Sequence, residues 1–144
     1  MEDHILKTLY LIEASNPDIC ICVTDQMLDF PGPNIVYVNK KWKEITGYSD
    51  EEAIGKSPRI LQGPKSCKET LSKLKANLKE GKKFEGTSIN YRKNGSEFNI
   101  TWITIEPMFG CFISLQKVHD EQEIILELLK EIEVGLVEKL KEYI

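Results

Sequence analysis

The stretch VYVNKKWKEITGYSDEEAIGK, residues 36–56, decides the fold because it contains three elements together with the signals that end them. VYVN has the β-branched and aromatic composition of a strand. KKWKEIT predicts a short helix, and Gly47 follows it at the position where glycine commonly ends helices. Ser49 and Glu52 have the spacing of a capping box, so a second short helix begins there and ends at Gly55. The stretch therefore predicts a strand followed by two short helices.

The sequence on either side extends this pattern. Hydrophobic periodicity predicts helices at 2–15, 40–48, 49–55, 66–80 and 119–144, and strands at 19–25, 35–39, 84–92, 97–107 and 112–118. RKNGS (92–96) predicts a hairpin turn and FGC (109–111) a tighter one. Runs of strands on either side of a helical insert predict an α+β domain, in which an antiparallel sheet carries helices on one face.

Composition excludes several function classes. The chain has 144 residues, the size of one domain, and a formal net charge of −4, which argues against nucleic-acid binding. No apolar run approaches the roughly 20 residues of a membrane span, so we expect a cytoplasmic protein with no membrane partner. The four cysteines form no CxxC pair, which favours free thiols over a metal site. We find no catalytic triad or phosphate loop and expect no enzymatic activity.

The C-terminal segment carries a broad apolar stripe. Its members recur at helical spacing at Ile124, Leu128, Ile132, Leu136, Leu140 and Ile144. Such a stripe needs a partner surface, and we expect a homodimer through the terminal helices. The alternative is that the helix folds back over its own sheet.

The element order resembles the PAS superfamily, together with the tracts VTD, PRILQG, NYRKNGSEF and FISLQ and the stretch at 36–56. Within this superfamily, the chain is most similar to the flavin-binding LOV (light, oxygen or voltage) domains. The likeness divides the chain into an N-terminal helix (1–16), a core (17–118) and a C-terminal amphipathic helix (119–144). It implies a five-stranded antiparallel sheet with short helices on one face and flanking terminal helices, and a flavin held between the sheet and the short helices.

The resemblance assigns roles to individual residues. Arg59 matches an arginine that pairs with the flavin phosphate, and Lys75 lies where a second phosphate-binding arginine is usual. Gln62 matches a glutamine that contacts the ribityl chain. Asn90 and Gln116 match amides at the edge of the isoalloxazine ring. The two phosphate-facing cations favour the mononucleotide FMN, with FAD as the alternative.

The position of the family's second asparagine stays open. Counting forward from NYRKNG reaches Ile100, whereas counting back from TIEPM reaches Thr101. Asn99 and Thr101 share a strand face with Ile103 and Ile105, so either polar residue is a candidate hydrogen-bonding partner. The remaining candidate wall residues are Cys22, Thr24, Ser57, Pro58, Phe112 and Ser114.

The chain departs from the LOV pattern at Pro58. LOV domains carry a cysteine immediately before the matched arginine, and proline has no nucleophile with which to form the flavin–cysteinyl adduct. Ser57 and Pro58 instead fit the N-cap and first position of a helix. Cys22 aligns with an apolar residue that lines the flavin pocket in the family. We therefore interpret Cys22 as part of the pocket wall and not as a substitute nucleophile. Haem is discounted because both histidines, His4 and His119, lie outside the core.

These observations support two hypotheses. The first is a flavin-binding sensory domain that responds to the flavin redox state, with blue light acting by photoreduction, and that signals to an unknown partner through its terminal helices. The second is a PAS dimerisation module that binds no flavin. A flavin absorption spectrum in the purified protein distinguishes the two.

Overall fold

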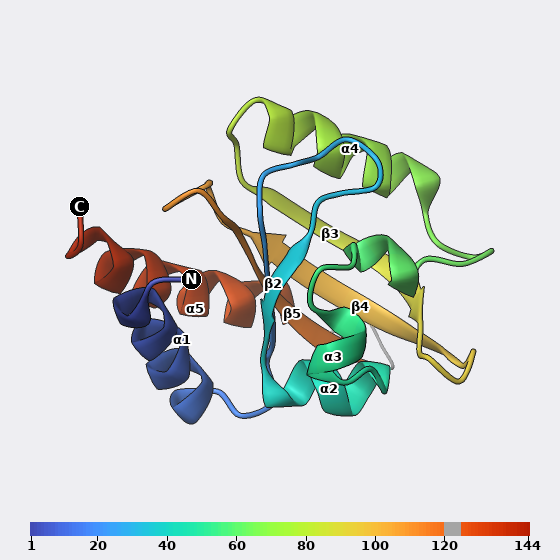
Figure 1. Ribbon diagram of the computed structural model, residues 1–144, viewed down its shortest axis with the longest axis horizontal. Coiled ribbons are helices and arrows are strands. Elements are labelled where there is room, and N and C mark those ends of the chain that lie inside the picture. Colours follow the sequence, from blue (N-terminus) through green and yellow to red (C-terminus); the bar gives the residue numbers. More distant parts are fainter. Residues whose placement is uncertain (120–124) are drawn as a thin grey trace.

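The computed structural model describes residues 1–119 and 125–144 and shows a five-stranded sheet covered by helices on both faces (Figure 1). The elements are α1 (Asp3–Ser15), β1 (Cys20–Thr24), β2 (Ile35–Val38), α2 (Lys40–Thr46), α3 (Asp50–Ala53), the 3₁₀ helix η1 (Pro58–Leu61), α4 (Lys68–Lys79), β3 (Phe84–Tyr91), β4 (Glu97–Thr104), β5 (Phe112–His119) and α5 (Ile125–Lys141). This order confirms the predicted α+β class.

The sheet is antiparallel throughout, with the strand order β2-β1-β5-β4-β3. β5 lies in the middle because it pairs with the N-terminal β1 on one side and with β4 on the other. The inserted segment from α2 to α4 lies on one face of the sheet. α1 and α5 pack side by side against the other face (Figure 1).

The helix boundaries follow from the local signals in the sequence. The side chain of Asn39 accepts a hydrogen bond from the Trp42 amide at the start of α2. Gly47 ends this helix in the left-handed conformation, with φ of 80°. Ser49 and its capping-box partner begin α3. Pro58 stands at the start of η1, as predicted, and the Ser57 hydroxyl accepts from the amide of the following residue.

Three described members of the apolar stripe of α5, Ile132, Leu136 and Leu140, pack on the chain's own sheet, whereas Leu128 is 40% and Ile144 87% exposed. Leu129, Leu136 and Leu140 are fully buried in one cluster with residues of α1 and of β1, β4 and β5. The stripe therefore has a partner surface within the chain, which corrects the reason given for a dimer. The prediction that the C-terminal helix starts at His119 is wrong, because His119 is the last residue of β5 and pairs with Asn99. Residues 120–124, also predicted to be helical, lie outside the described ranges.

Ion pairs add to this packing at the edge strand. Glu133 of α5 is 7% exposed, and its carboxylate lies 3.3 Å from the ammonium group of Lys83, the residue that precedes β3. Lys130 lies 3.7 Å from the carboxylate of Glu85 on β3. These pairs connect α5 to the opposite edge of the sheet from α1, so the helix is anchored along both of its sides.

Candidate functional site

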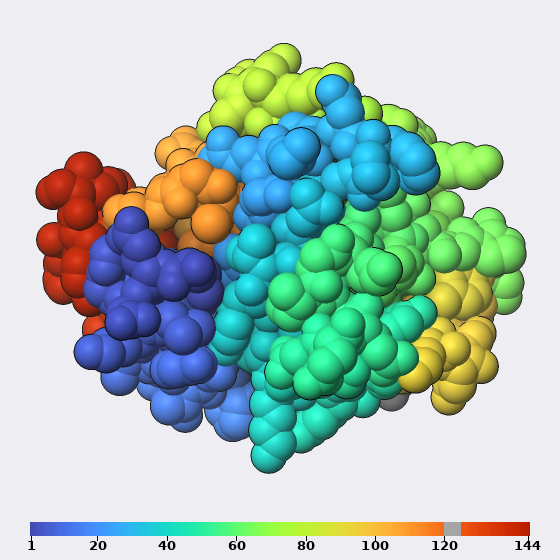
Figure 2. Space-filling view, viewed as in Figure 1, coloured from blue at the N-terminus to red at the C-terminus, as the bar shows by residue number. Residues whose placement is uncertain are grey.

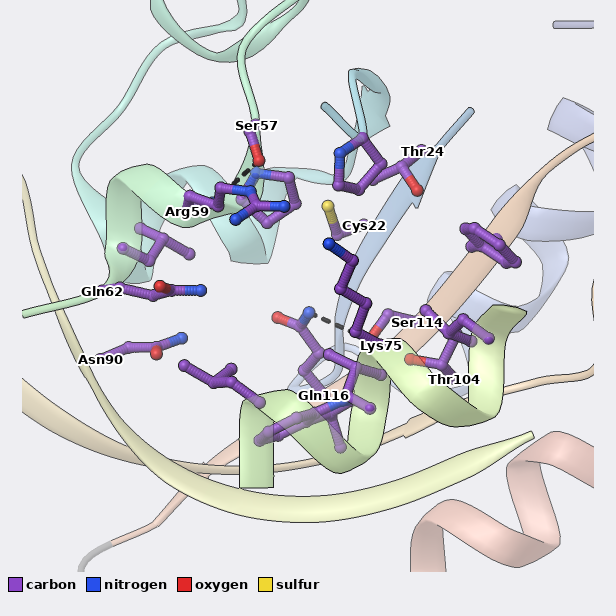
Figure 3. Close-up of a pocket in the computed structure, with 18 of the residues that line it drawn as sticks. Cys22, Thr24, Ser57, Arg59, Gln62, Lys75, Asn90, Thr104, Ser114 and Gln116 are labelled. Carbon is purple, nitrogen blue, oxygen red and sulfur yellow. Dashed lines mark hydrogen bonds between the residues drawn. The ribbon is translucent and has the colours of Figure 1, made fainter. Parts of the chain in front are cut away.

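A cavity of about 450 Å³ lies between the sheet and the inserted helices. This volume lies within the range of roughly 300–1,000 Å³ that is typical of small-molecule sites. Its walls come from β1, η1, α4, β3, β4 and β5, so residues far apart in the sequence converge on it (Figure 3). Three leucines of α4 that recur at helical spacing, Leu71, Leu74 and Leu78, line the cavity.

The loop between β1 and β2 lies at the rim of this cavity. The Arg59 guanidinium donates to the backbone carbonyls of Gly32, at 2.9 Å, and Leu28, at 3.0 Å. The Lys75 ammonium lies 3.7 Å from the carboxylate of Asp29. On the surface, this loop (blue) lies against the segments that carry η1 and α4 (green; Figure 2). Two cationic side chains from different elements thus lie at the rim. The loop contributes Asp29, which pairs with Lys75, and two carbonyls, which accept from Arg59.

Three amide side chains reach the cavity from three different elements (Figure 3). Gln62 follows η1, Asn90 lies on β3 and Gln116 on β5. The Gln116 amide donates to the Ser114 hydroxyl at 3.1 Å. The side-chain amides of Gln62 and Asn90 have no hydrogen-bond partner within residues 1–119 and 125–144. Polar groups in a pocket require partners, so this donor and acceptor set fits a planar heterocycle with a polar edge.

The cysteine in the cavity wall is not an activated nucleophile. Cys22 is 3% exposed, and burial raises the pKa of its thiol to about 12. Because the thiolate is the reactive form, a thiol with this pKa is inert near neutral pH. Pro58 also lines the cavity and offers no nucleophile. The described wall residues provide hydrogen-bonding groups and apolar contact.

The structure corrects the expected face of β4. Thr101 lies on the far side of the sheet, where its hydroxyl contacts the hydroxyl of Thr87 and a ring nitrogen of His119, each at 2.8 Å. Ile103 and Ile105 are buried beneath α1 and α5. Asn99 is exposed on that same far side and is absent from the cavity lining.

The cavity is lined instead by the alternate residues of β4, Ile100, Trp102 and Thr104. The forward count that reached Ile100 therefore matches the observed face, and an aliphatic side chain stands where an asparagine was sought. Gly86 on β3 faces the same side, and a Cβ there would lie 3.1 Å from the Trp102 ring and 2.7 Å from the Phe84 ring. The space that the small residues of β3 leave is thus partly filled by aromatic rings.

The other predicted residues are brought together. The cavity lining includes Cys22, Thr24, Ser57, Pro58, Arg59, Gln62, Lys75, Asn90, Phe112, Ser114 and Gln116. Sequence reasoning missed Leu28, Pro33, Trp42, Leu61, Lys68, Leu71, Ser72, Leu74, Leu78, Ile100, Trp102 and Thr104 as lining residues. Helical spacing could have found the α4 members, because Lys68, Leu71, Ser72 and Lys75 share one face.

Comparison with known proteins agrees with this geometry. The family model described as "PAS domain" matches residues 17–132. The chain belongs to the PAS domain family. Among curated proteins, this PAS domain is 35% identical over 134 residues to the "Blue-light photoreceptor" of Listeria innocua, covering 89% of the chain and 50% of that relative. It is 30% identical over 125 residues to the "Blue-light-activated histidine kinase 1" of Erythrobacter litoralis, covering 85% of the chain and 33% of that relative.

Solved structures show the same fold. The PAS domain superposes on the "Structure of RsLOV d2 variant" with a TM-score of 0.78 and 19% identity, over 99% of this chain and 84% of that one. The LOV domain of an Erythrobacter litoralis blue-light activated histidine kinase gives a TM-score of 0.65 and 22% identity, over 72% of this chain and 97% of that one. The chain spans half or less of the two curated relatives described above. None of its described helices is long and apolar enough to cross a membrane.

Proposed function

We propose that this PAS domain is a flavin-binding sensory domain of the LOV type that responds to the redox state of its flavin. The observation that carries the proposal is the convergence of Gln62, Asn90 and Gln116 on one cavity with a largely apolar wall. The blue-light relatives support it. A bound flavin would supply one- and two-electron redox chemistry and absorption of blue light.

The cavity residues divide between two ends of such a ligand. Arg59 and Lys75 at the rim would hold a phosphate. Arg59 uses two of its nitrogens on loop carbonyls, and its guanidinium has five N–H donors in all. Gln62 would contact the ribityl chain, and Asn90 and Gln116 would pair with the polar edge of the ring. We favour the mononucleotide because both cations lie at a single rim.

The response does not use a covalent bond from the protein. Pro58 replaces the thiol expected from the LOV pattern, and the Cys22 thiol stays protonated because burial raises its pKa to about 12. Light would then act by photoreduction. The protein would bind the ring and hold hydrogen-bond donors and acceptors at its edge. A change in this hydrogen bonding would be transmitted to the sheet and the terminal helices.

β5 would transmit a change in the cavity to the terminal helices. Its residues alternate between the two faces: Ser114 and Gln116 face the cavity, whereas Ile113 and Leu115 are buried under α1 and α5. An amide can exchange its donor for its acceptor by rotating. A rotation of Gln116 would reverse its bond with the Ser114 hydroxyl, which can donate as well as accept. This change in pairing would lie on the strand against which α5 packs. The terminal helices would carry the signal to a separate partner.

The test measures flavin in the purified protein and in a matched pair of variants. We expect a flavin absorption spectrum from the wild type, and chromatography of the ligand released by denaturation identifies the mononucleotide or dinucleotide. Asn90→Ala should weaken flavin binding by about 1–3 kcal/mol because a ring acceptor loses its donor. Asn99→Ala, on the exposed far side of the sheet, should leave binding unchanged. A folded protein that takes up no flavin would refute the proposal.

A ligand-free dimerisation module is the second candidate. Apolar side chains on the outer sides of the terminal helices favour it, because Leu11 is 59% and Val134 57% exposed. A homodimer through these outer sides is also compatible with the sensory function. Light scattering tests it: Leu11→Lys together with Val134→Lys should convert a dimer into a monomer, and an unaltered dimer would place the interface elsewhere.

A further inference from the structure

Two oxidisable aromatic side chains form a line from the cavity towards the surface. Trp42 on α2 is 1% exposed and lines the cavity. Its ring centroid lies 6.5 Å from that of Tyr48, with an interplanar angle of 36°. Tyr48 follows the glycine that ends α2 and is partly exposed. A short helix thus places a buried indole between the cavity and a phenol at the surface.

The surroundings of the two rings determine what each does after losing an electron. The indole N–H of Trp42 is buried and has no hydrogen-bond acceptor among the described residues. An oxidised indole there cannot pass its proton to a neighbouring side chain, and it remains a cation in an apolar cluster, which is costly. Taking an electron from Tyr48 removes that buried charge. The phenol of Tyr48 carries a donor O–H and can release its proton towards water.

We propose that Trp42 and Tyr48 are an electron relay that reduces a ligand bound in the cavity. Trp42 gives one electron to the photoexcited ligand and regains one from Tyr48, which loses its phenolic proton to water. A thiol in solution then returns a hydrogen atom to Tyr48. Two such turns deliver two electrons, and the two thiyl radicals that are left combine as one disulfide. The relay rests on the proposed flavin function and identifies the source of its electrons.

The second cavity tryptophan tests the competing entry point for the electrons. Trp102 on β4 is also buried and lines the cavity. Its ring neighbour is Phe84, at 6.0 Å between centroids. Phenylalanine is far harder to oxidise than tyrosine, so an electron lost from Trp102 is not replaced from the surface by this neighbour. Trp102→Phe removes a cavity indole of the same kind without removing the relay.

The experiment follows loss of the flavin absorption band under blue light without oxygen, at a fixed thiol concentration. We expect Trp42→Phe and Tyr48→Phe to slow photoreduction by an order of magnitude or more. Tyr10→Phe is the matched control, because it removes an exposed phenol of α1 on the face of the sheet away from the cavity, and it should change the rate little. Tyr48→Phe keeps the ring and lies at the surface, so it tests the relay even if Trp42→Phe folds poorly. Electron paramagnetic resonance of frozen illuminated samples should show a tyrosyl radical in the wild type and none in Tyr48→Phe.

The outcomes separate the two proposals. Flavin-loaded variants that all photoreduce at the wild-type rate, or an undiminished tyrosyl signal in Tyr48→Phe, would overturn the relay and leave flavin binding intact. A larger loss in Trp102→Phe than in Trp42→Phe would also overturn it, since the electrons would then enter through β4. A protein that binds no flavin would overturn both proposals.

Discussion

The packing of α5 on its own sheet predicts the stability of two leucine variants on that helix. Leu136 is fully buried, whereas Leu128 is 40% exposed. Truncating a buried leucine to alanine costs about 2–5 kcal/mol because the transfer free energy is lost and a cavity remains. An exposed position away from such packing changes the free energy of unfolding by about 0.5 kcal/mol or less.

These values convert into melting temperatures. At roughly 2–4 °C per kcal/mol for a chain of about this size, Leu136→Ala should lower Tm by roughly 4–20 °C. Leu128→Ala is the matched control and should lower Tm by no more than about 2 °C. Circular dichroism of both variants and the wild type, over a wide range of protein concentrations, measures the difference.

Concentration dependence shows where the stripe is buried. A helix packed within its own chain predicts that the difference between the two variants stays constant on dilution. If a second copy covered Leu136 instead, its contribution would depend on protein concentration by mass action. Equal Tm losses in the two variants, or a Leu136→Ala loss that disappears on dilution, would refute the packing described above.

Three further predictions concern the cavity and the thiols. Pro58→Cys should form a thiol adduct with the flavin under blue light without an added donor and revert in the dark; a folded, flavin-loaded variant that forms none would show that the ring lies elsewhere. Gln116→Leu leaves a polar group of the ring edge unpaired, at a cost of about 1–3 kcal/mol, and should shift the flavin absorption band; an unshifted band would exclude contact with Gln116. Hydrogen bonding from Thr70 lowers the pKa of exposed Cys67, so its thiolate fraction at a given pH is larger than that of an ordinary cysteine. Iodoacetamide at pH 8 should therefore label Cys67 well before Cys22, as read by mass spectrometry, and equal labelling would contradict the burial of Cys22.

The elements predicted correctly are those determined by local interactions. The end of α2 depends on a glycine with positive φ, and the start of α3 depends on a capping box. Both signals lie within a few residues of the boundary that they determine. The 3₁₀ turn at Pro58 depends on the fixed φ of proline. Such signals are complete in a short stretch of sequence, so the structure reproduces them.

The errors arose where the outcome depends on distant parts of the chain. The face of β4 depends on where one additional residue is accommodated, and the count from either end of the strand gave a different answer. The pairing of β4 with β5 determines this face. Trp102 lies directly opposite Gln116, so its side chain lies on the cavity face of the sheet. The partner of the α5 stripe was equally undetermined, since an apolar helix face fits a second copy and its own sheet alike.

The corrected face of β4 changes what the cavity can sense. With Ile100 in the wall in place of an asparagine, the edge of a bound flavin ring would have one fixed amide fewer, and more of its pairing would depend on Asn90 and Gln116. Asn90 lies on the edge strand β3, whereas Gln116 lies on the central strand, directly between cavity and helices. Under the proposed function, a change in protonation at the ring edge would therefore act most strongly on the strand that contacts α5. An isoleucine at position 100 would thus concentrate the response on Gln116, whose neighbours Leu115 and Ile113 pack against the terminal helices.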